Sequence, residues 1–132
     1  MREVLFGIVA VSLPAGTALL VSMNDPGEGA AINYRSPPSL SEAGTAGRTV
    51  FRASCATCHG TLAQGTGNGP PLLHPAYART RYSDAEFRAA VREGRASRLW
   101  SFGPMPDHED LSGERLDNIV AYVRDLQKAS GL

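Results

Sequence analysis

The sequence has little cysteine and no excess of charge of either sign. Its 132 residues contain two cysteines, so a function that uses both of them leaves no cysteine for a disulfide. Thirteen basic and thirteen acidic side chains give a formal net charge of zero. A general affinity for nucleic acid is therefore not expected. The sequence also lacks internal repeats and long charge runs, and its length suits one domain of about 100–150 residues with some additional chain.

Both cysteines lie in one short motif, Cys55-Ala56-Thr57-Cys58-His59, a C-x-x-C-H sequence. This pattern is typical of the attachment of a c-type haem. Two thiols add across the vinyl groups of the porphyrin, and the adjacent histidine is held where its imidazole can bind the iron. The motif therefore predicts one covalent haem c. Because haem attachment happens outside the cytoplasm, it also predicts an exported domain.

Two other uses of a C-x-x-C pair fit the sequence less well. A thioredoxin-like redox site needs a βαβ context, and no β-rich alternating segment flanks Cys55. A zinc site needs two more ligands at short spacing, whereas His74 and His108 are both distant from the pair.

The chain begins with a long apolar segment. Residues 4–23 carry no charge, and a helix of that length is about as long as the hydrocarbon core of a membrane is thick. We expect residues 1–23 to form a retained transmembrane anchor. The alternative is a signal peptide that is cleaved after Ala18 or Ala31. Arg2 precedes the apolar segment and acids follow it, so the positive-inside tendency leaves the rest of the chain outside.

A Gly- and Pro-rich stretch follows this segment. Residues 24–38 have neither helical nor strand periodicity and too little apolar surface to fold alone. We expect a flexible tether, with docking of Ile32 and Tyr34 onto a partner subunit as the alternative.

Three helices are expected in residues 39–132. The first begins at a capping box formed by Ser39 and Glu42 and runs to about residue 54, with Ala46, Val50 and Phe51 on its buried face. Close approach of another helix would explain Gly47 within it. The second spans residues 84–93 after a capping box of Ser83 and Glu86, and Gly94 stops it.

The last helix, residues 111–128, has the clearest apolar periodicity. Ser112 can cap it, with Leu111 and Leu116 as a hydrophobic staple. Its apolar face follows 3.6-residue spacing and contains Leu116, Ile119, Val120, Val123 and Leu126.

Between the motif and the second helix, residues 60–69 are too glycine-rich for regular structure and Pro70 and Pro71 then stiffen the chain. Proline keeps its carbonyl, so a carbonyl here could accept a hydrogen bond from the other nitrogen of His59. Met105 lies between two prolines, in a loop where ordinary core packing explains it poorly.

C-x-x-C-H-G followed by G-P-x-L resembles the class I c-type cytochromes, small helical electron carriers. The resemblance covers about residues 39–128. It implies an all-α fold of three main helices around one covalent haem, here preceded by an N-terminal apolar helix and a linker. It implies that Pro70 supplies the carbonyl to His59, that Leu72 packs on the ring, and that the sulfur of Met105 is the second axial ligand. It also implies that Tyr122 meets the first helix.

Other roles in this region stay open. His108 and His74 compete with Met105 as axial ligands, although both fit plain surface histidines. Six arginines gather in residues 79–98 and are expected to form a solvated face, with Arg79 or Arg81 as alternative partners of a haem propionate. Trp100 and Phe102 lie at the ring edge or fill the core.

The resemblance implies an electron-transfer protein rather than an enzyme. Its iron would cycle between Fe(II) and Fe(III) with both axial positions filled by His59 and Met105. We expect a membrane-anchored electron carrier with its haem domain in the periplasm or an equivalent space, shuttling between respiratory or photosynthetic redox complexes. The alternatives are a fixed haem c subunit of a larger oxidoreductase, and a ligand-binding haem or small peroxidase in which Met105 leaves the iron.

Overall fold

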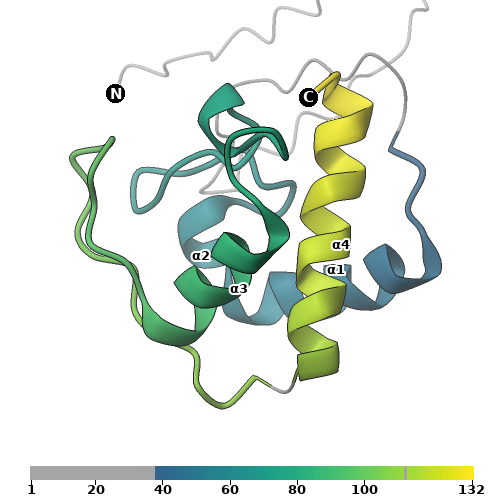
Figure 1. Cartoon of the computed structure of the whole chain (residues 1–132), viewed down its shortest axis with the longest axis horizontal. Coiled ribbons are helices and arrows are strands. Elements are labelled where there is room, and N and C mark those ends of the chain that lie inside the picture. The colour runs from purple at the N-terminus through teal and green to yellow at the C-terminus, as the bar shows by residue number, and fades with distance from the viewer. Residues whose placement is uncertain (1–37, 112) are drawn as a thin grey trace, which may run out of the picture.

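The computed structural model describes residues 38–111 and 113–132 (Figure 1). The expected anchor or signal at residues 1–23, nearly all of the linker at residues 24–38, and the cap at Ser112 lie outside the described residues. Within the described ranges, no helix is long and apolar enough to cross a membrane.

The described chain is helical. Its elements are α1 (Glu42–Ser54), α2 (Ala56–His59), the 3-10 helix η1 (Pro75–Tyr77), α3 (Asp84–Glu93) and α4 (Gly113–Ser130). No strand forms in the described part of the chain, where β-type pairing is limited to two isolated bridges. The three main helices predicted from the sequence are therefore α1, α3 and α4, and the all-α fold class is confirmed.

The capping box at the start of α3 is present as expected. The hydroxyl of Ser83 accepts from the backbone N–H of Glu86, and the carboxylate of Glu86 accepts from the N–H of Ser83 at 2.7 Å. Gly94 ends the helix in a left-handed conformation with φ of 69°. A side chain there would also meet the carbonyl of Met105, since a Cβ would lie 2.7 Å from that oxygen.

The start and the buried face of α1 differ from the prediction. Ser41, rather than Ser39, caps the helix, because its hydroxyl accepts from the N–H of Gly44 at 3.0 Å. The hydroxyl and N–H of Ser41 in turn donate to the carboxylate of Asp125 in α4, each at 2.8 Å. This tertiary contact selects Ser41 as the cap.

Ala46 was also expected on the buried face of α1 and is exposed. The face that packs on α4 contains Gly44, Gly47 and Phe51, with Val50 half-buried beside it. Small residues are needed here because α4 comes so close. A Cβ on Gly47 would lie 1.8 Å from the backbone oxygen of Asn118.

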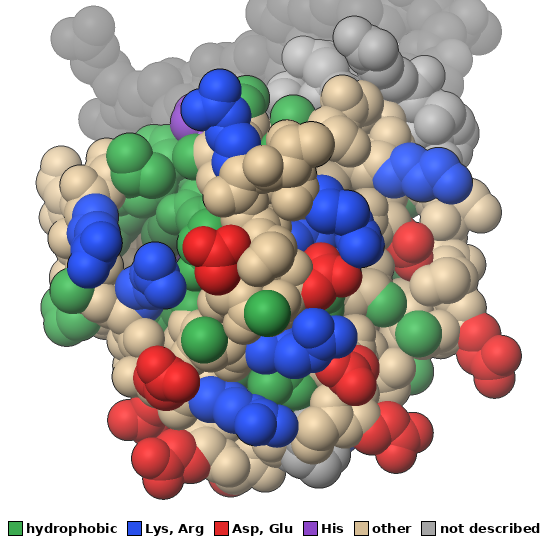
Figure 2. Space-filling model, in the orientation of Figure 1, with side chains coloured by type: hydrophobic (Ala, Val, Ile, Leu, Met, Phe, Trp, Pro, Cys, Tyr) green, Lys and Arg blue, Asp and Glu red, His purple; other side chains and the backbone are tan. Residues whose placement is uncertain are grey.

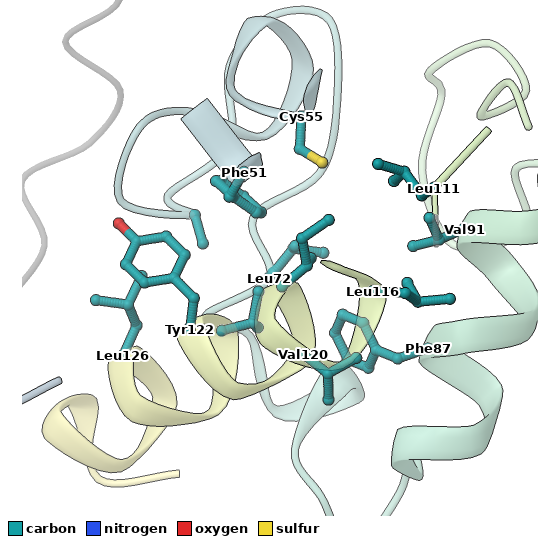
Figure 3. Packing of buried hydrophobic residues seen from close by; sticks show 13 residues of the cluster. Phe51, Cys55, Leu72, Phe87, Val91, Leu111, Leu116, Val120, Tyr122 and Leu126 are labelled. Atoms are coloured by element: carbon teal, nitrogen blue, oxygen red, sulfur yellow. The ribbon is translucent and has the colours of Figure 1, made fainter. Parts of the chain in front are cut away.

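The crossing of α1 and α4 forms the centre of the core (Figure 3). The rings of Phe51 and Tyr122 pack with centroids 5.3 Å apart, as the resemblance to class I cytochromes implied. The hydroxyl of Tyr122 donates to the carbonyl of Thr61 at 2.8 Å, which ties the loop after α2 to α4. All five apolar positions predicted on the last helix are buried: Leu116, Ile119, Val120, Val123 and Leu126.

Candidate functional site

A cavity of about 420 Å³ lies beside α2, between the core and the loop that follows α3. This volume is within the range of about 300–1,000 Å³ common for cofactor and ligand sites. Figure 2 shows apolar side chains gathered in a hollow on this side of the molecule, flanked by basic side chains. Of the residues expected from the sequence to contact the haem, those that line the cavity are Cys55, His59, Pro70, Leu72, Trp100, Phe102 and Met105, whereas Cys58 is not among the lining residues.

The C-x-x-C-H motif follows directly on α1. Cys55 ends α1 by donating its N–H to the carbonyl of Phe51, and the next four residues form the short helix α2. Cys55 is buried and Cys58 half-buried, and no disulfide joins them. Burial, with a smaller effect of Cys58, raises the pKa of the Cys55 thiol to about 11. Cys55 is therefore a neutral thiol at neutral pH wherever it is not linked to haem.

His59, at the end of α2, is only 7% exposed. Its Nδ1 donates to the carbonyl oxygen of Pro70 at 2.9 Å, which assigns the proton to Nδ1. Nε2 has no hydrogen-bond partner among the described residues. Burial lowers the pKa of His59, and the bond to Pro70 opposes this more weakly, so the neutral form of the ring is favoured. A neutral imidazole with one oriented nitrogen and one free nitrogen at an apolar cavity fits a metal ligand.

The glycine-rich loop after α2 wraps closely around the motif. Gly65 donates its N–H to the carbonyl of His59 at 2.7 Å, and the Thr66 hydroxyl donates to the carbonyl of Cys58 at 2.7 Å. Gly69 packs directly on Cys58, because a Cβ there would lie 2.8 Å from the Cβ of Cys58. These contacts provide hydrogen-bond donors for the carbonyls at the end of α2 and hold the loop close to the motif, so that Pro70 lies next to His59.

Met105 lies in the loop that forms the other side of the cavity. Its backbone pairs with Arg95 through two hydrogen bonds, N–H of Met105 to carbonyl at 2.8 Å and N–H of Arg95 to carbonyl at 3.0 Å. Its side chain is half-buried and packs against the apolar core. This bridge closes the loop of residues 96–104 and brings Met105, ten residues after Arg95, back to the end of α3 and to the cavity.

The competing histidines are not among the residues that line the cavity. His74 accepts from the N–H of Ala76 and so caps η1, and its ring meets that of Trp100 with centroids 5.2 Å apart. His108 donates its N–H to the carbonyl of Val91 at 2.8 Å. Of the three candidates for the second axial position, the cavity brings only Met105 together with His59.

The basic side chains at the cavity differ from those singled out in the sequence. Arg79 pairs with Asp84 at 2.9 Å, and neither Arg79 nor Arg81 lines the cavity. Arg95 and Arg98 line it instead, and the guanidinium of Arg95 lies 5.5 Å from the ring centroid of Tyr82. Spacing along the chain could not reveal this, since Arg95 and Arg98 lie in the loop after α3, where the pairing of Arg95 with Met105 is a tertiary contact.

Aromatic residues complete the cavity. Trp100 and Phe102 both line it, with ring centroids 6.2 Å apart, and the indole N–H of Trp100 donates to the hydroxyl of Tyr77 at 3.1 Å. Tyr77, Tyr82 and Phe87 also line it, and sequence reasoning missed the first two. The only available signal was their position between the proline pair and α3.

Comparison with known proteins agrees with the helical fold and with the C-x-x-C-H motif. Residues 42–123 match the family described as cytochrome C oxidase, cbb3-type, subunit III. Cytochrome c-554(547) of Halothiobacillus neapolitanus is 34% identical, and the match covers 62% of this chain and 94% of that protein. The crystal structure of the c-type cytochrome XoxG from Methylobacterium extorquens AM1 is similar with a TM-score of 0.54 and 22% identity. That match covers 68% of this chain and 53% of XoxG, so it shows the fold over about half of XoxG's length.

The helical fold and the C-x-x-C-H motif beside an apolar cavity define a monohaem c-type cytochrome, an electron-transfer protein with one covalently bound haem c. The chain belongs to the family described as cytochrome C oxidase, cbb3-type, subunit III. Cytochrome c domains are usually extracytoplasmic, which agrees with the compartment expected from the motif.

Proposed function

We propose that the chain is a single-electron carrier whose haem is linked through Cys55 and Cys58 and held by His59 and Met105. The observation that carries this proposal is that His59 and Met105 line the same apolar cavity, with His59 oriented by Pro70. The haem supplies the one-electron Fe(II)/Fe(III) couple. His59 and Met105 would hold the iron, and Leu72 with the aromatic side chains of the cavity would keep water from the haem.

The spectrum of the full-length holoprotein tests the ligand set. The oxidised protein should show the far-red charge-transfer band of methionine-bound haem and should resist cyanide. Met105→Ala should abolish the band, lower the reduction potential and let cyanide bind, because the thioether raises the potential and blocks the sixth position. His74→Ala and His108→Ala serve as controls and should leave the spectrum unchanged. Retention of the band in Met105→Ala would refute the assignment.

We further propose that residues 1–23 anchor the carrier in the membrane and that the haem domain lies in the periplasm or an equivalent space. The uncharged segment of residues 4–23 supports this. The membrane-bound protein should keep its original N-terminus, whereas a cleaved signal would give a mature chain that begins near residue 19 or 32. Sequencing the N-terminus of protein extracted from membranes distinguishes the two.

The family description supports a second candidate, a fixed haem c subunit of a membrane oxidoreductase, since it refers to a subunit of an oxidase. Purification of the full chain in mild detergent separates the candidates. A tethered shuttle between redox complexes should elute alone. Stoichiometric co-elution with catalytic subunits would favour the fixed subunit.

A further inference from the structure

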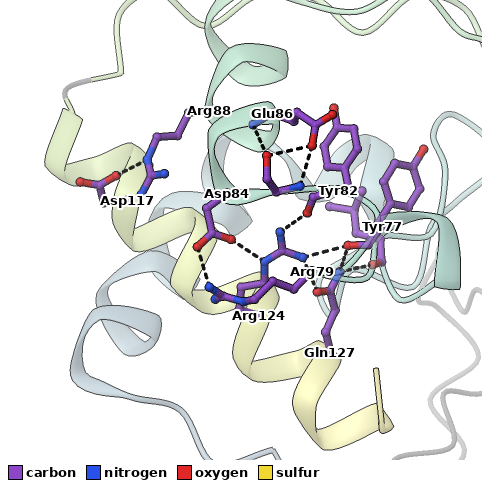
Figure 4. A network of polar contacts seen from close by, with 11 residues as sticks. Tyr77, Arg79, Tyr82, Asp84, Glu86, Arg88, Asp117, Arg124 and Gln127 are labelled. Atoms are coloured by element: carbon purple, nitrogen blue, oxygen red, sulfur yellow. Dashed lines mark hydrogen bonds and ion pairs between the residues drawn. The ribbon is translucent and has the colours of Figure 1, made fainter.

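The side chain of Arg124 extends from α4 toward Tyr77, Tyr82 and Asp84 (Figure 4). This side chain is only 8% exposed. A buried guanidinium is costly unless its charge and its N–H groups are all compensated. The compensation found here involves residues 72–82, called the wall segment below. This segment joins the proline pair to α3 and contributes Leu72, Ala76, Tyr77 and Tyr82 to the cavity.

The guanidinium reaches the wall segment through backbone carbonyls. Its Nη1 donates to the carbonyl of Tyr77 at 2.8 Å and its Nη2 donates to the carbonyl of Tyr82. Its Nε donates to Asp84 at 2.8 Å, which supplies the opposite charge. Apart from η1, the wall segment has no helix or strand, so its buried carbonyls need donors from elsewhere in the molecule.

Gln127, one turn further along α4 and 2% exposed, extends the same arrangement. Its amide oxygen accepts from Nη1 of Arg124 at 2.7 Å, and its Nε2 donates to the carbonyls of Leu72 at 2.8 Å and Tyr77 at 3.0 Å. Arg124 and Gln127 thus bind the carbonyls of three of the four wall residues that line the cavity, Leu72, Tyr77 and Tyr82.

The shape of the guanidinium matters for this contact. A planar group with a fixed fork of donors can bind two carbonyls and a carboxylate together, whereas a lysine ammonium is a compact charge on a flexible stem. The face of Phe87, which also lines the cavity, lies 4.8 Å from the guanidinium carbon. Arg124 therefore contacts the cavity lining on two sides without reaching into the cavity itself.

We propose that Arg124 is a positioning residue for the haem cavity: with Gln127 it fixes the wall segment against α4, and thereby keeps the apolar wall closed on the haem. The inference rests on the proposed function in so far as the cavity holds the haem. It differs from a role in general stability, because it requires a local effect on the wall segment and on the surroundings of the iron.

Hydrogen exchange of the full-length holoprotein tests the local effect. The amides of Leu72, Tyr77 and Tyr82 each donate to a nearby carbonyl and report on the wall segment. Arg124→Lys keeps the charge but loses the fork, and should speed exchange at these amides by about tenfold or more relative to helical amides of α1. Arg88→Gln is the matched control. It removes the exposed ion pair with Asp117, which also joins α3 to α4, but it removes no contact to the wall segment.

The reduction potential gives the second measurement. Loosening the wall admits water to the haem, and greater exposure favours the oxidised state. Arg124→Gln and Arg124→Lys should both lower the potential, whereas Arg88→Gln should not. If the guanidinium acted only through its charge, Arg124→Lys would keep the original potential. That result, or uniform acceleration of exchange in every helix, would overturn the proposal.

Gln127→Leu keeps the test decisive if the Arg124 variants do not accumulate as holoprotein. It removes two donors to Leu72 and Tyr77 without changing a charge, and should speed exchange at the same amides. Unchanged exchange there would overturn the proposal. The proposed function and this inference can fail independently. If His59 and Met105 did not both bind the iron, the unsubstituted protein would lack the far-red methionine band. The exchange rates of the wall segment could still change in the Arg124 and Gln127 variants as expected.

Discussion

The carbonyl oxygen of Pro70 accepts a hydrogen bond from Nδ1 of His59 at 2.9 Å, across eleven residues of chain. This bond fixes the tautomer of the imidazole and leaves Nε2 as the nitrogen available to a metal. Such a partner also raises the basicity of a ligating histidine. Proline suits the position because its fixed φ holds the carbonyl in place and it has no N–H to satisfy.

Pro70→Ala should therefore raise the reduction potential. Alanine keeps the carbonyl but frees the backbone, so the hydrogen bond to His59 weakens and the ligand becomes less basic. The added backbone freedom of the unfolded chain should also cost about 0.4–1 kcal/mol of stability. Pro75→Ala, at the start of η1, is the matched control: its stability loss should be similar but its potential unchanged. Equal potentials in the two variants would contradict the role of Pro70. Redox titration with guanidinium unfolding measures both quantities.

Gly47→Ala should destabilise the protein although alanine is the better helix former. The gain in helix propensity is about 1 kcal/mol. Against it, the new Cβ would lie 1.8 Å from the backbone oxygen of Asn118, so α1 and α4 must separate. Overpacking of this kind costs about 1–3 kcal/mol or more, and the net effect should be a loss measurable by urea unfolding. Gly67→Ala is the control, because nothing lies within 4 Å of its Cβ position. A variant at Gly47 as stable as the control would contradict the close crossing.

Tyr122→Phe isolates the hydrogen bond between α4 and the loop after α2. Phenylalanine retains the ring contact with Phe51, whose centroid is 5.3 Å away, and removes the donation to the carbonyl of Thr61. The expected loss of unfolding free energy is about 1 kcal/mol. Tyr122→Leu loses the ring as well and should cost distinctly more. If the two variants lost the same amount, the ring contact would contribute nothing and the packing of this crossing would need another explanation.

Glu86→Gln should change how stability depends on pH. The hydrogen bonds from the N–H and hydroxyl of Ser83 lower the pKa of Glu86 from its ordinary value of 4.5. A carboxyl group whose pKa is lower in the folded state than in the unfolded state stabilises the fold at pH values above its unfolded-state pKa. This contribution disappears as the pH falls through the folded-state pKa. The unsubstituted protein should thus exceed Glu86→Gln in melting temperature above about pH 4.5, and the difference should vanish in stronger acid. A difference in melting temperature that stays constant through this pH range would contradict the role of the Ser83 hydrogen bonds.

Local sequence predicted α3 well and α1 less well. Ser83, Glu86 and Gly94 form a complete set of start and stop residues, and the helix follows them as predicted. At α1 two serines precede Glu42, and both could cap the helix. The choice of Ser41 depends on Asp125, which is 84 positions away and bonds to it. The exposed position of Ala46 has the same origin, because the approach of α4 selects the glycine-lined face of α1.

The sequence by itself determined the identity of the cofactor, because the five adjacent residues of the C-x-x-C-H motif supply both thiols and the histidine that a covalent haem needs. The apolar face of α4 and the caps of α3 were determined locally too, through helical periodicity and backbone hydrogen bonding. The tertiary structure alone decided which arginines reach the cavity, and that a charged residue of α4 holds its wall. A buried guanidinium is stable only where the fold brings carbonyls and a carboxylate to it. The positions of these residues along the chain do not reveal that Arg124 donates hydrogen bonds to Tyr77, Tyr82 and Asp84.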